Sequence, residues 1–162
     1  MYSDKVIGHV TDSQFKYKEI DYLELDWHQS HNKILRQNTN GGRDVALRFD
    51  DEILKSGLKD GDVIGITKDD VLIVISIKSV DCLVVNANQN MESLIKASYE
   101  IGNCHAPLFG GDTYWQLVTI YNEPMEALLK NIPNVTLEHK IVKLNFDKKI
   151  SSIIGHSHHH SH

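Results

Sequence analysis

Histidine is the residue type whose distribution in this chain points to chemistry. Five of the ten histidines lie in the last seven residues, at His156, His158, His159, His160 and His162. Neutral imidazoles this close together can bind a borderline divalent ion such as Ni²⁺, Zn²⁺ or Cu²⁺. A purification tag is the alternative origin, but a standard tag is an unbroken run, and serines interrupt this one. We expect the tail to bind metal with modest affinity, because ordering a flexible chain costs entropy.

A further histidine, His105, follows a helical pattern in the segment ASYEIGNCHAPLFGGD. The end of a helix carries unpaired carbonyls and partial negative charge, which favours a nearby cation, and Pro107 restricts the loop. A lone histidine at such a place is more often a cap or surface residue than a ligand. One histidine per chain cannot form a tight site, but a homodimer with His105 near its two-fold axis would bring two imidazoles together.

Cys104 precedes His105 and is a possible additional metal ligand, or a nucleophile with His105 as its base. Adjacent side chains usually point in different directions, so a buried, inert thiol is the favoured interpretation. A hydrolase finds little support, because no third orienting residue or oxyanion loop can be identified.

The remaining histidines carry weaker signals. His28 and His31 have a three-residue offset, but they follow a strand pattern and are expected to lie in a loop exposed to water. His9 and His139 lie in strand-like runs, and the sequence assigns them no role.

Composition describes an ordinary globular protein, with 41% hydrophobic and 24% charged residues. A net charge of -5 gives no electrostatic footprint for a nucleic-acid backbone. The longest apolar run, residues 71–77, is far shorter than the ~20 residues that span a bilayer. We therefore expect a cytoplasmic protein with free thiols at Cys82 and Cys104.

Up to Lys78 the hydrophobic pattern is that of short strands. Apolar and polar side chains alternate over residues 23–27 and 45–49, as expected for half-buried strands. The sequence NGG at 40–42 can supply the positive φ of a hairpin turn. We predict a small all-β N-terminal domain over residues 1–78.

From Ser79 onward the pattern changes. A strand-like run at 80–85 precedes helical spacing of apolar residues from Met91 to Ile101. Asn90 is placed to cap this helix, and Gly102 is expected to end it in the left-handed conformation. His105 then lies in the exit loop.

Two short extended pieces flank the turn at 110–112, and a second helix through Asn131 precedes an extended stretch over 135–146. The order β-α-β-β-α-β predicts a ferredoxin-like domain over residues 79–150, followed by a flexible histidine-rich tail over 151–162. The predicted fold class is therefore α+β.

The segment YEIGNCHAPLFGGD resembles the UreE family of urease accessory proteins, the nickel metallochaperones. The most specific match is Gly102, Asn103 and His105, because the family pattern is Gly-Asn-x-His. The segment YLELDWHQSHNKILRQNTNGGRDVALRF is similar to the family's N-terminal region, and GLKDGDVI is similar to its turn at Gly61 and Asp62. The likeness covers nearly the whole chain.

The resemblance implies a homodimer whose ferredoxin-like domains meet at a nickel ion, held by His105 of each protomer. It also implies a peptide-binding-like N-terminal domain and no enzymatic turnover. The implied partners are the urease apoprotein and the GTPase accessory protein that completes nickel insertion. The family commonly has arginine where this chain has Cys104, which allows a site with some sulfur character. Assembly of dimers into tetramers stays open.

Two functional hypotheses follow. In the first, the tail histidines collect Ni²⁺ and present it at the paired His105 site, with Zn²⁺ or Cu²⁺ as substitutes. In the alternative, the chain is a non-metal adaptor that binds extended peptides of a partner protein at an edge strand of its β domain. Nickel binding distinguishes the two.

Overall fold

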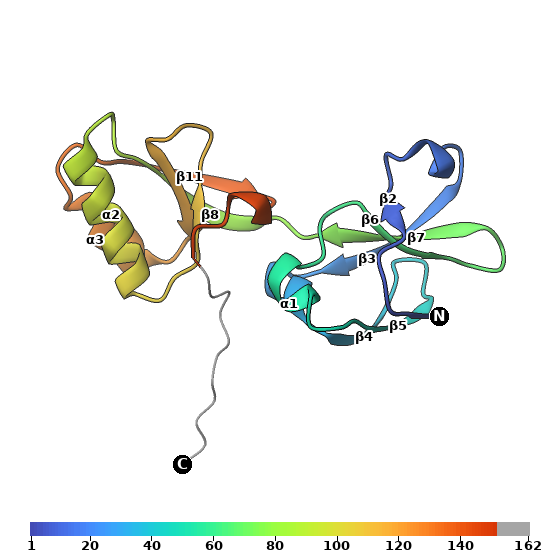
Figure 1. The fold of residues 1–162 in the computed structure, drawn as a ribbon. Coiled ribbons are helices and arrows are strands. Elements are labelled where there is room, and N and C mark those ends of the chain that lie inside the picture. The colour runs from blue at the N-terminus through green and yellow to red at the C-terminus, as the bar shows by residue number, and fades with distance from the viewer. Residues whose placement is uncertain (152–162) are drawn as a thin grey trace, which may run out of the picture. The chain divides into compact units, whose positions relative to one another are not determined.

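The computed structural model describes residues 1–151 of the 162, so the five tail histidines lie outside the described residues. The chain divides into two compact units, Met1–Lys78 and Ser79–His162 (Figure 1). Strands predominate and helices are few, which confirms the predicted mixed α+β character. No helix of the described part has both the length and the apolar character that a bilayer crossing requires.

The first unit contains two sheets, with strand orders β1-β5-β4 and β2-β6-β7-β3. Its strands are β1 Tyr2–Ser3, β2 Gly8–His9, β3 Glu19–Leu25, β4 Ile34–Asn38, β5 Asp44–Arg48, β6 Asp62–Ile66 and β7 Val71–Ile77. Helix α1 is short, Ile53–Ser56, and two 3-10 turns occupy Ser13–Phe15 and Trp27–His31.

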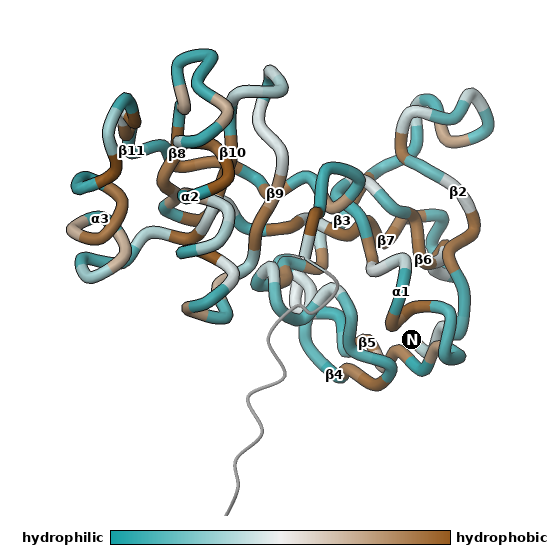
Figure 2. The backbone as a smooth tube through the Cα atoms, turned by 60° about the vertical axis from the view of Figure 1, so that its left-hand side comes forward, coloured by the Kyte–Doolittle hydropathy of each residue, from teal (hydrophilic) through white to brown (hydrophobic). Residues whose placement is uncertain are grey.

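Strand β7 is apolar at every position except Ser76, because both of its faces are buried. Ile73 and Ile75 belong to a cluster that joins the two sheets, whereas Leu72 and Val74 pack with Phe15 in a second cluster. The hydropathy colouring of Figure 2 shows β3, β6 and β7 as the apolar centre of this unit. Burial of this apolar surface is the main stabilising contribution to the unit.

The hairpin between β4 and β5 turns at Gly42, whose φ of +82° is the positive value expected of the NGG sequence. Asp21 of β3 fixes the position of this hairpin through hydrogen bonds. Its carboxylate accepts hydrogen bonds from the Thr39 hydroxyl at 2.6 Å, the Gly41 amide at 2.8 Å and the Arg43 guanidinium at 2.7 Å. Burial alone would raise the pKa of Asp21, but these donors outweigh burial and lower the pKa below its usual value.

The second unit contains one four-stranded sheet and two helices. Its elements are β8 Val80–Asn86, α2 Met91–Asn103, β9 Leu108–Gly110, β10 Gln116–Ile120, α3 Glu123–Lys130, β11 Thr136–Val142 and a 3-10 turn at Phe146–Lys148. The strand order is β11-β8-β10-β9, and every pairing is antiparallel.

Both helices of the second unit cover the same face of its sheet (Figure 1). Leu83, Val85 and Leu117 of the sheet pack there against Ile101 of α2 and Leu129 of α3. After β11 the chain returns past the opposite face and forms an isolated bridge between Phe109 of β9 and Lys149. This return path brings the end of the described chain to the strand that follows His105.

Candidate metal centre at the end of helix α2

Helix α2 begins as the sequence predicts. The Asn90 side chain accepts a hydrogen bond from the Ser93 amide at 2.9 Å, which satisfies one of the free amides of the first turn. Ala97 and Ile101 are fully buried against the sheet. The helix is therefore fixed at its start and along one side.

The solvent side of α2 carries an exposed stripe formed by Met91, Ile95 and Tyr99. These side chains are 57%, 61% and 66% exposed, and their four-residue spacing aligns them along the helix. A contiguous exposed apolar patch of this kind is a feature of interaction sites more often than of surface that contacts only solvent. The stripe runs toward the helix end that precedes His105.

The helix ends in a Schellman motif with His105 at the left-handed position. Its φ is +53°, its amide donates to the Gly102 carbonyl at 3.0 Å, and the Ala106 amide donates to the Ile101 carbonyl at 3.2 Å. These two bonds define the motif. The prediction that Gly102 adopts the left-handed conformation is wrong, because Gly102 lies inside α2.

A left-handed histidine is held against its backbone preference. The conformation costs an L-residue with a side chain roughly 1–2 kcal/mol, and glycine is the usual occupant of this position. Residues held in sparsely populated conformations cluster at functional sites. The unfavourable conformation at His105 therefore points to a use for its imidazole.

The loop after His105 is anchored from the sheet. Thr119 is fully buried, and its hydroxyl donates to the Pro107 carbonyl at 2.8 Å. Leu108 follows at once as the first residue of β9, opposite Thr119 in the ladder. The backbone is thus fixed on both sides of His105, within two residues of it.

Both His105 and Cys104 are exposed to solvent. The prediction of a buried thiol at position 104 is wrong: Cys104 is the cap residue just beyond α2 and does not reach the core. Cys82 is the buried thiol. Burial raises the pKa of Cys82 to about 11, and the charge of Asp81 adds to the effect. Cys104 is the accessible sulfur beside the candidate ligand.

Within residues 1–151, His105 has too few neighbouring donor side chains to complete a metal site. Among residues 1–151 no group of three or more His, Cys, Asp or Glu side chains is placed to hold a metal ion. Further ligands for an ion at His105 must therefore come from a second copy of the chain, from the histidine-rich tail, or from a partner protein.

The structure corrects one expectation about the other histidines. His28 is exposed as expected, but His31 is buried, at 8% exposure. Its Nδ1 lies 2.8 Å from the Ser30 hydroxyl, and a Cβ atom at Gly57 would lie 2.5 Å from its ring. The glycine at position 57 leaves space for the ring, a tertiary contact that no local sequence pattern indicates. His31 is therefore a structural residue.

His139, to which the sequence assigns no role, connects β11 to its neighbours. Its ring contacts the Tyr121 ring in a tilted arrangement, with centroids 4.1 Å apart and an interplanar angle of 56°. Its Nε2 and Nδ1 atoms lie 3.5 Å from a Glu126 oxygen and 3.9 Å from an Asp81 oxygen. These contacts join β8, α3 and β11 inside the second unit, and none of them involves His105.

Comparison with known proteins places this chain in a class. Residues 4–78 match the family model described as "UreE urease accessory protein, N-terminal domain". A urease accessory protein UreE from Acetivibrio thermocellus is 35% identical over 164 residues, covering 100% of both chains. Relatives of the same name from Helicobacter pylori strain G27 and Helicobacter acinonychis are each 28% identical over 149 residues, covering 92% of this chain and 84% of theirs.

These matches define the class as urease accessory proteins. Within that class, the chain belongs to the UreE family, as the resemblance of its sequence indicated. The match along the whole length of the Acetivibrio relative includes the end of α2 and His105.

Proposed function

We propose that this protein is a cytoplasmic nickel metallochaperone, which binds Ni²⁺ between two copies of His105 and delivers it for assembly of the urease active site. The observation that carries the proposal is the left-handed, exposed His105 at the end of α2. The protein turns over no substrate. Its partners are the urease apoprotein and the GTPase accessory protein that completes insertion.

The second copy of the chain covers the exposed stripe on α2. A two-fold interface uses the same patch on both subunits, so each stripe packs on its counterpart. The position of the axis matters, because a helix rises ~1.5 Å per residue. With antiparallel helices and the axis at Ile95, the two His105 residues would lie roughly 25 Å apart or more. The axis therefore passes near Tyr99 and His105.

The histidine-rich tail supplies nickel to this site. Ser151 is hydrogen-bonded to Leu108, three residues after His105. A chain extends at most ~3.6 Å per residue, so the five residues from Ser151 to His156 reach about 18 Å. The tail histidines are thus within reach of an ion held at His105, and Cys104 is an exposed additional donor.

An ion held by two imidazoles is incompletely coordinated, and this suits transfer. A recipient can add its own ligands before the donor ligands leave, whereas a closed four-ligand site of the structural kind would retain its ion. The partial negative charge at the end of α2 favours the cation without adding a ligand that must be broken. Imidazole also binds Zn²⁺ and Cu²⁺, which are expected to compete.

Calorimetric titration with Ni²⁺ tests the proposal. The native protein should bind one ion tightly per two chains and further ions weakly. His105→Ala should abolish the tight site and leave the weak sites, and deletion of residues 155–162 should do the reverse. Because imidazole must be neutral to bind, tight binding should weaken as pH falls. A tight site that survives in His105→Ala overturns the assignment.

The adaptor alternative is favoured by one observation. Strand β4 is the outer strand of its sheet, and Ile34 on it is 70% exposed, as a strand that accepts an added peptide strand would be. Protein lacking residues 155–162 and carrying His105→Ala separates the two functions. If that variant binds the urease apoprotein as strongly as the native chain and supports urease activation equally, the adaptor function is the principal one.

A further inference from the structure

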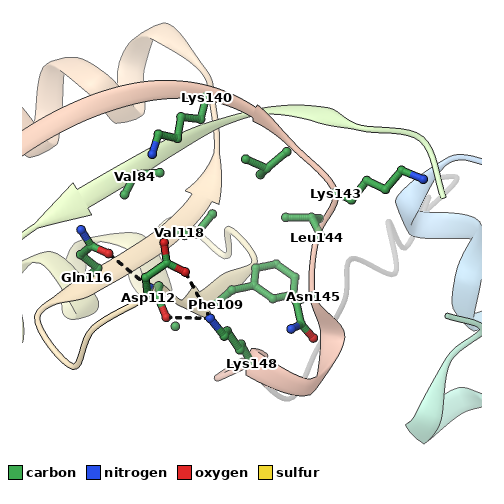
Figure 3. A pocket seen from close by; sticks show the side chains of 13 residues that line it. Val84, Phe109, Asp112, Gln116, Val118, Lys140, Lys143, Leu144, Asn145 and Lys148 are labelled. Atoms are coloured by element: carbon green, nitrogen blue, oxygen red, sulfur yellow. Dashed lines mark hydrogen bonds and ion pairs between the residues drawn. The ribbon is translucent and has the colours of Figure 1, made fainter. Parts of the chain in front are cut away.

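The face of the second unit's sheet that turns away from α2 and α3 carries a cavity of about 210 Å³. Phe109, Val118 and Val84 are successive register partners across β9, β10 and β8 and form its apolar floor. Leu144 enters from the returning chain segment (Figure 3). The proposed nickel site lies at the end of a helix on the other face of the sheet, so the cavity serves no purpose in that proposal.

Three lysines, Lys140, Lys143 and Lys148, and one acidic residue, Asp112, border the cavity. Lys140 comes from β11 and Lys148 from the returning segment (Figure 3). The Lys148 ammonium donates to the Gly111 carbonyl at 3.1 Å and lies 3.4 Å from the Asp112 carboxylate, and that of Lys140 lies 3.4 Å from Glu138. The side chains of Asp112 and Glu138 are 91% and 61% exposed, so these pairs contribute little.

The surrounding segment is basic in an acidic protein. Residues 139–150 contain four lysines and one aspartate, whereas the whole chain has a net charge of -5. A local excess of one charge sign steers partners of the opposite sign and excludes those of the same sign. The cavity therefore favours an acidic ligand.

The cavity continues into a broader groove along the hairpin between β9 and β10. This second hollow, of about 640 Å³, shares Gly111, Asp112 and Lys148 with the cavity. Tyr114 and Ile150 line it and are 97% and 57% exposed. Exposed aromatic residues beside an apolar pocket are typical of protein interfaces.

Size decides between a small molecule and a protein segment. At about 210 Å³ the cavity is smaller than the roughly 300–1,000 Å³ of sites that hold drug-sized ligands. It is large enough for one large apolar side chain, and a buried apolar anchor surrounded by a polar rim is the usual centre of a protein interface. The adjoining groove has room for the residues that flank such an anchor.

We infer that this face is a docking site for an extended acidic segment of a partner protein, with one large apolar side chain in the cavity and flanking carboxylates beside Lys140 and Lys148. The inference does not depend on nickel binding. Docking on this face leaves the exposed stripe of α2, which covers the opposite face of the sheet, uncovered.

The probe is the capped heptapeptide Glu-Glu-Gly-Leu-Gly-Glu-Glu, titrated into full-length protein in the presence of EDTA and followed by methyl NMR. The Val84 and Val118 methyl signals should shift. Lys140→Glu combined with Lys148→Glu should weaken binding about tenfold or more, and binding should weaken as salt rises. Lys96→Glu combined with Lys130→Glu, on exposed positions of α2 and α3, is the matched control and should have little effect.

Changes to the peptide provide the remaining tests. Replacing leucine by alanine should abolish the methyl shifts, and replacing the glutamates by glutamines should remove the salt dependence. The inference is overturned if the two lysine pairs weaken binding equally, if Val84 and Val118 do not respond, or if hexanoate binds in the cavity while the peptide does not. Because EDTA removes nickel, none of these results bears on the His105 proposal.

Discussion

Ser151 and Leu108 exchange two hydrogen bonds: the Ser151 amide donates to the Leu108 carbonyl at 3.2 Å, and the Leu108 amide donates to the Ser151 hydroxyl at 3.2 Å. The Ile150 amide donates to the same carbonyl at 2.8 Å. Phe146 adds an edge contact with Phe109, with ring centroids 6.0 Å apart. The C-terminal segment is therefore attached to β9, directly after the loop that carries His105.

Detaching this segment should weaken nickel binding through the tail. Phe146→Ala with Ser151→Pro removes the ring contact and the Ser151 amide. If these losses also release the Ile150 bond to Leu108 and free the segment back to Val142, the free chain before His156 grows from five residues to fourteen, counted from Ser151 and from Val142. Effective concentration falls as about the 3/2 power of length, so the tail's contribution to affinity should fall about fivefold. Calorimetry measures it.

The same double variant in a chain that lacks residues 155–162 is the control. There it should leave nickel affinity unchanged, because no tail remains to be positioned. An equal loss in both backgrounds would show that the substitutions damage the His105 site itself, and the tethering role would be wrong.

Substitutions at His105 should separate metal binding from stability. His105→Gly removes the imidazole but relieves the left-handed conformation, so it should lose the tight nickel site and be about 1 kcal/mol more stable than His105→Ala. His105→Asn tolerates the conformation and also lacks the imidazole. Urea unfolding of the three variants gives the stability order, which should place alanine last. If His105→Ala were the most stable of the three variants, the strained geometry at position 105 would be contradicted.

The end of α2 also shows where sequence reasoning stops. Apolar spacing and the Asn90 cap located the helix, because both are local properties of the chain. The position of the left-handed residue depends on which turn packs Ala106 against the core cluster that contains Ile101, and that is a tertiary property. Glycine at position 102 predicts the left-handed residue there, but α2 runs to Asn103 and the left-handed residue is His105.

Burial of single residues was hard to predict for the same reason. Strand β7 was recognisable because two buried faces leave Ser76 as the one polar residue in its sequence. Cys104 and His31 each lie at the end of a helical element. At such a position, a rotation by a fraction of a turn decides whether the side chain is buried in the core or exposed to solvent. For His31 the deciding feature is Gly57, 26 positions away in the chain, which no local pattern connects to it.

The two thiols should differ sharply in reactivity at neutral pH. Cys82 is fully buried and its pKa is raised to about 11 by burial, so it should stay unreactive as a thiol. Cys104 is exposed and should react with DTNB, giving one reactive thiol per native chain and two after denaturation. Bound Ni²⁺ should slow the reaction of Cys104 if its sulfur is near the ion. The Cys104→Ser variant should have no fast-reacting thiol, which would identify Cys104 as the reactive residue.

Asp21 should make the first unit sensitive to acid. Its pKa is lowered in the folded state, because the hydrogen bonds from Thr39, Arg43 and Gly41 outweigh the opposing effect of burial. The resulting stability is present above the unfolded pKa of about 3.9 and is lost as pH falls through the lower folded value. Asp21→Asn should cost about 2–3 kcal/mol at pH 7, and this difference should shrink below about pH 4.

Tryptophan fluorescence can follow this effect in the full chain. Trp27 packs against the core of the first unit, and a Trp115→Phe background removes the tryptophan of the second. Urea unfolding at pH 7, 5 and 3 then measures the Asp21 contribution. A difference between native and Asp21→Asn protein that stays constant across these values would show that the carboxylate charge is not responsible.

The stripe on α2 should show a gradient of effects along the helix. If the two-fold axis lies near His105, Tyr99→Glu places a charge close to the axis, where it faces its own copy, and should both dissociate the dimer and abolish the tight nickel site. Met91→Glu lies two turns further away and should weaken the dimer less. Ile141→Glu, at a 78% exposed position on β11, controls for added surface charge. Sedimentation equilibrium with and without Ni²⁺ measures the dimerisation of all three variants. Equal effects at Met91 and Tyr99 would place the axis at the middle of the helix, too far from His105 for a shared ion.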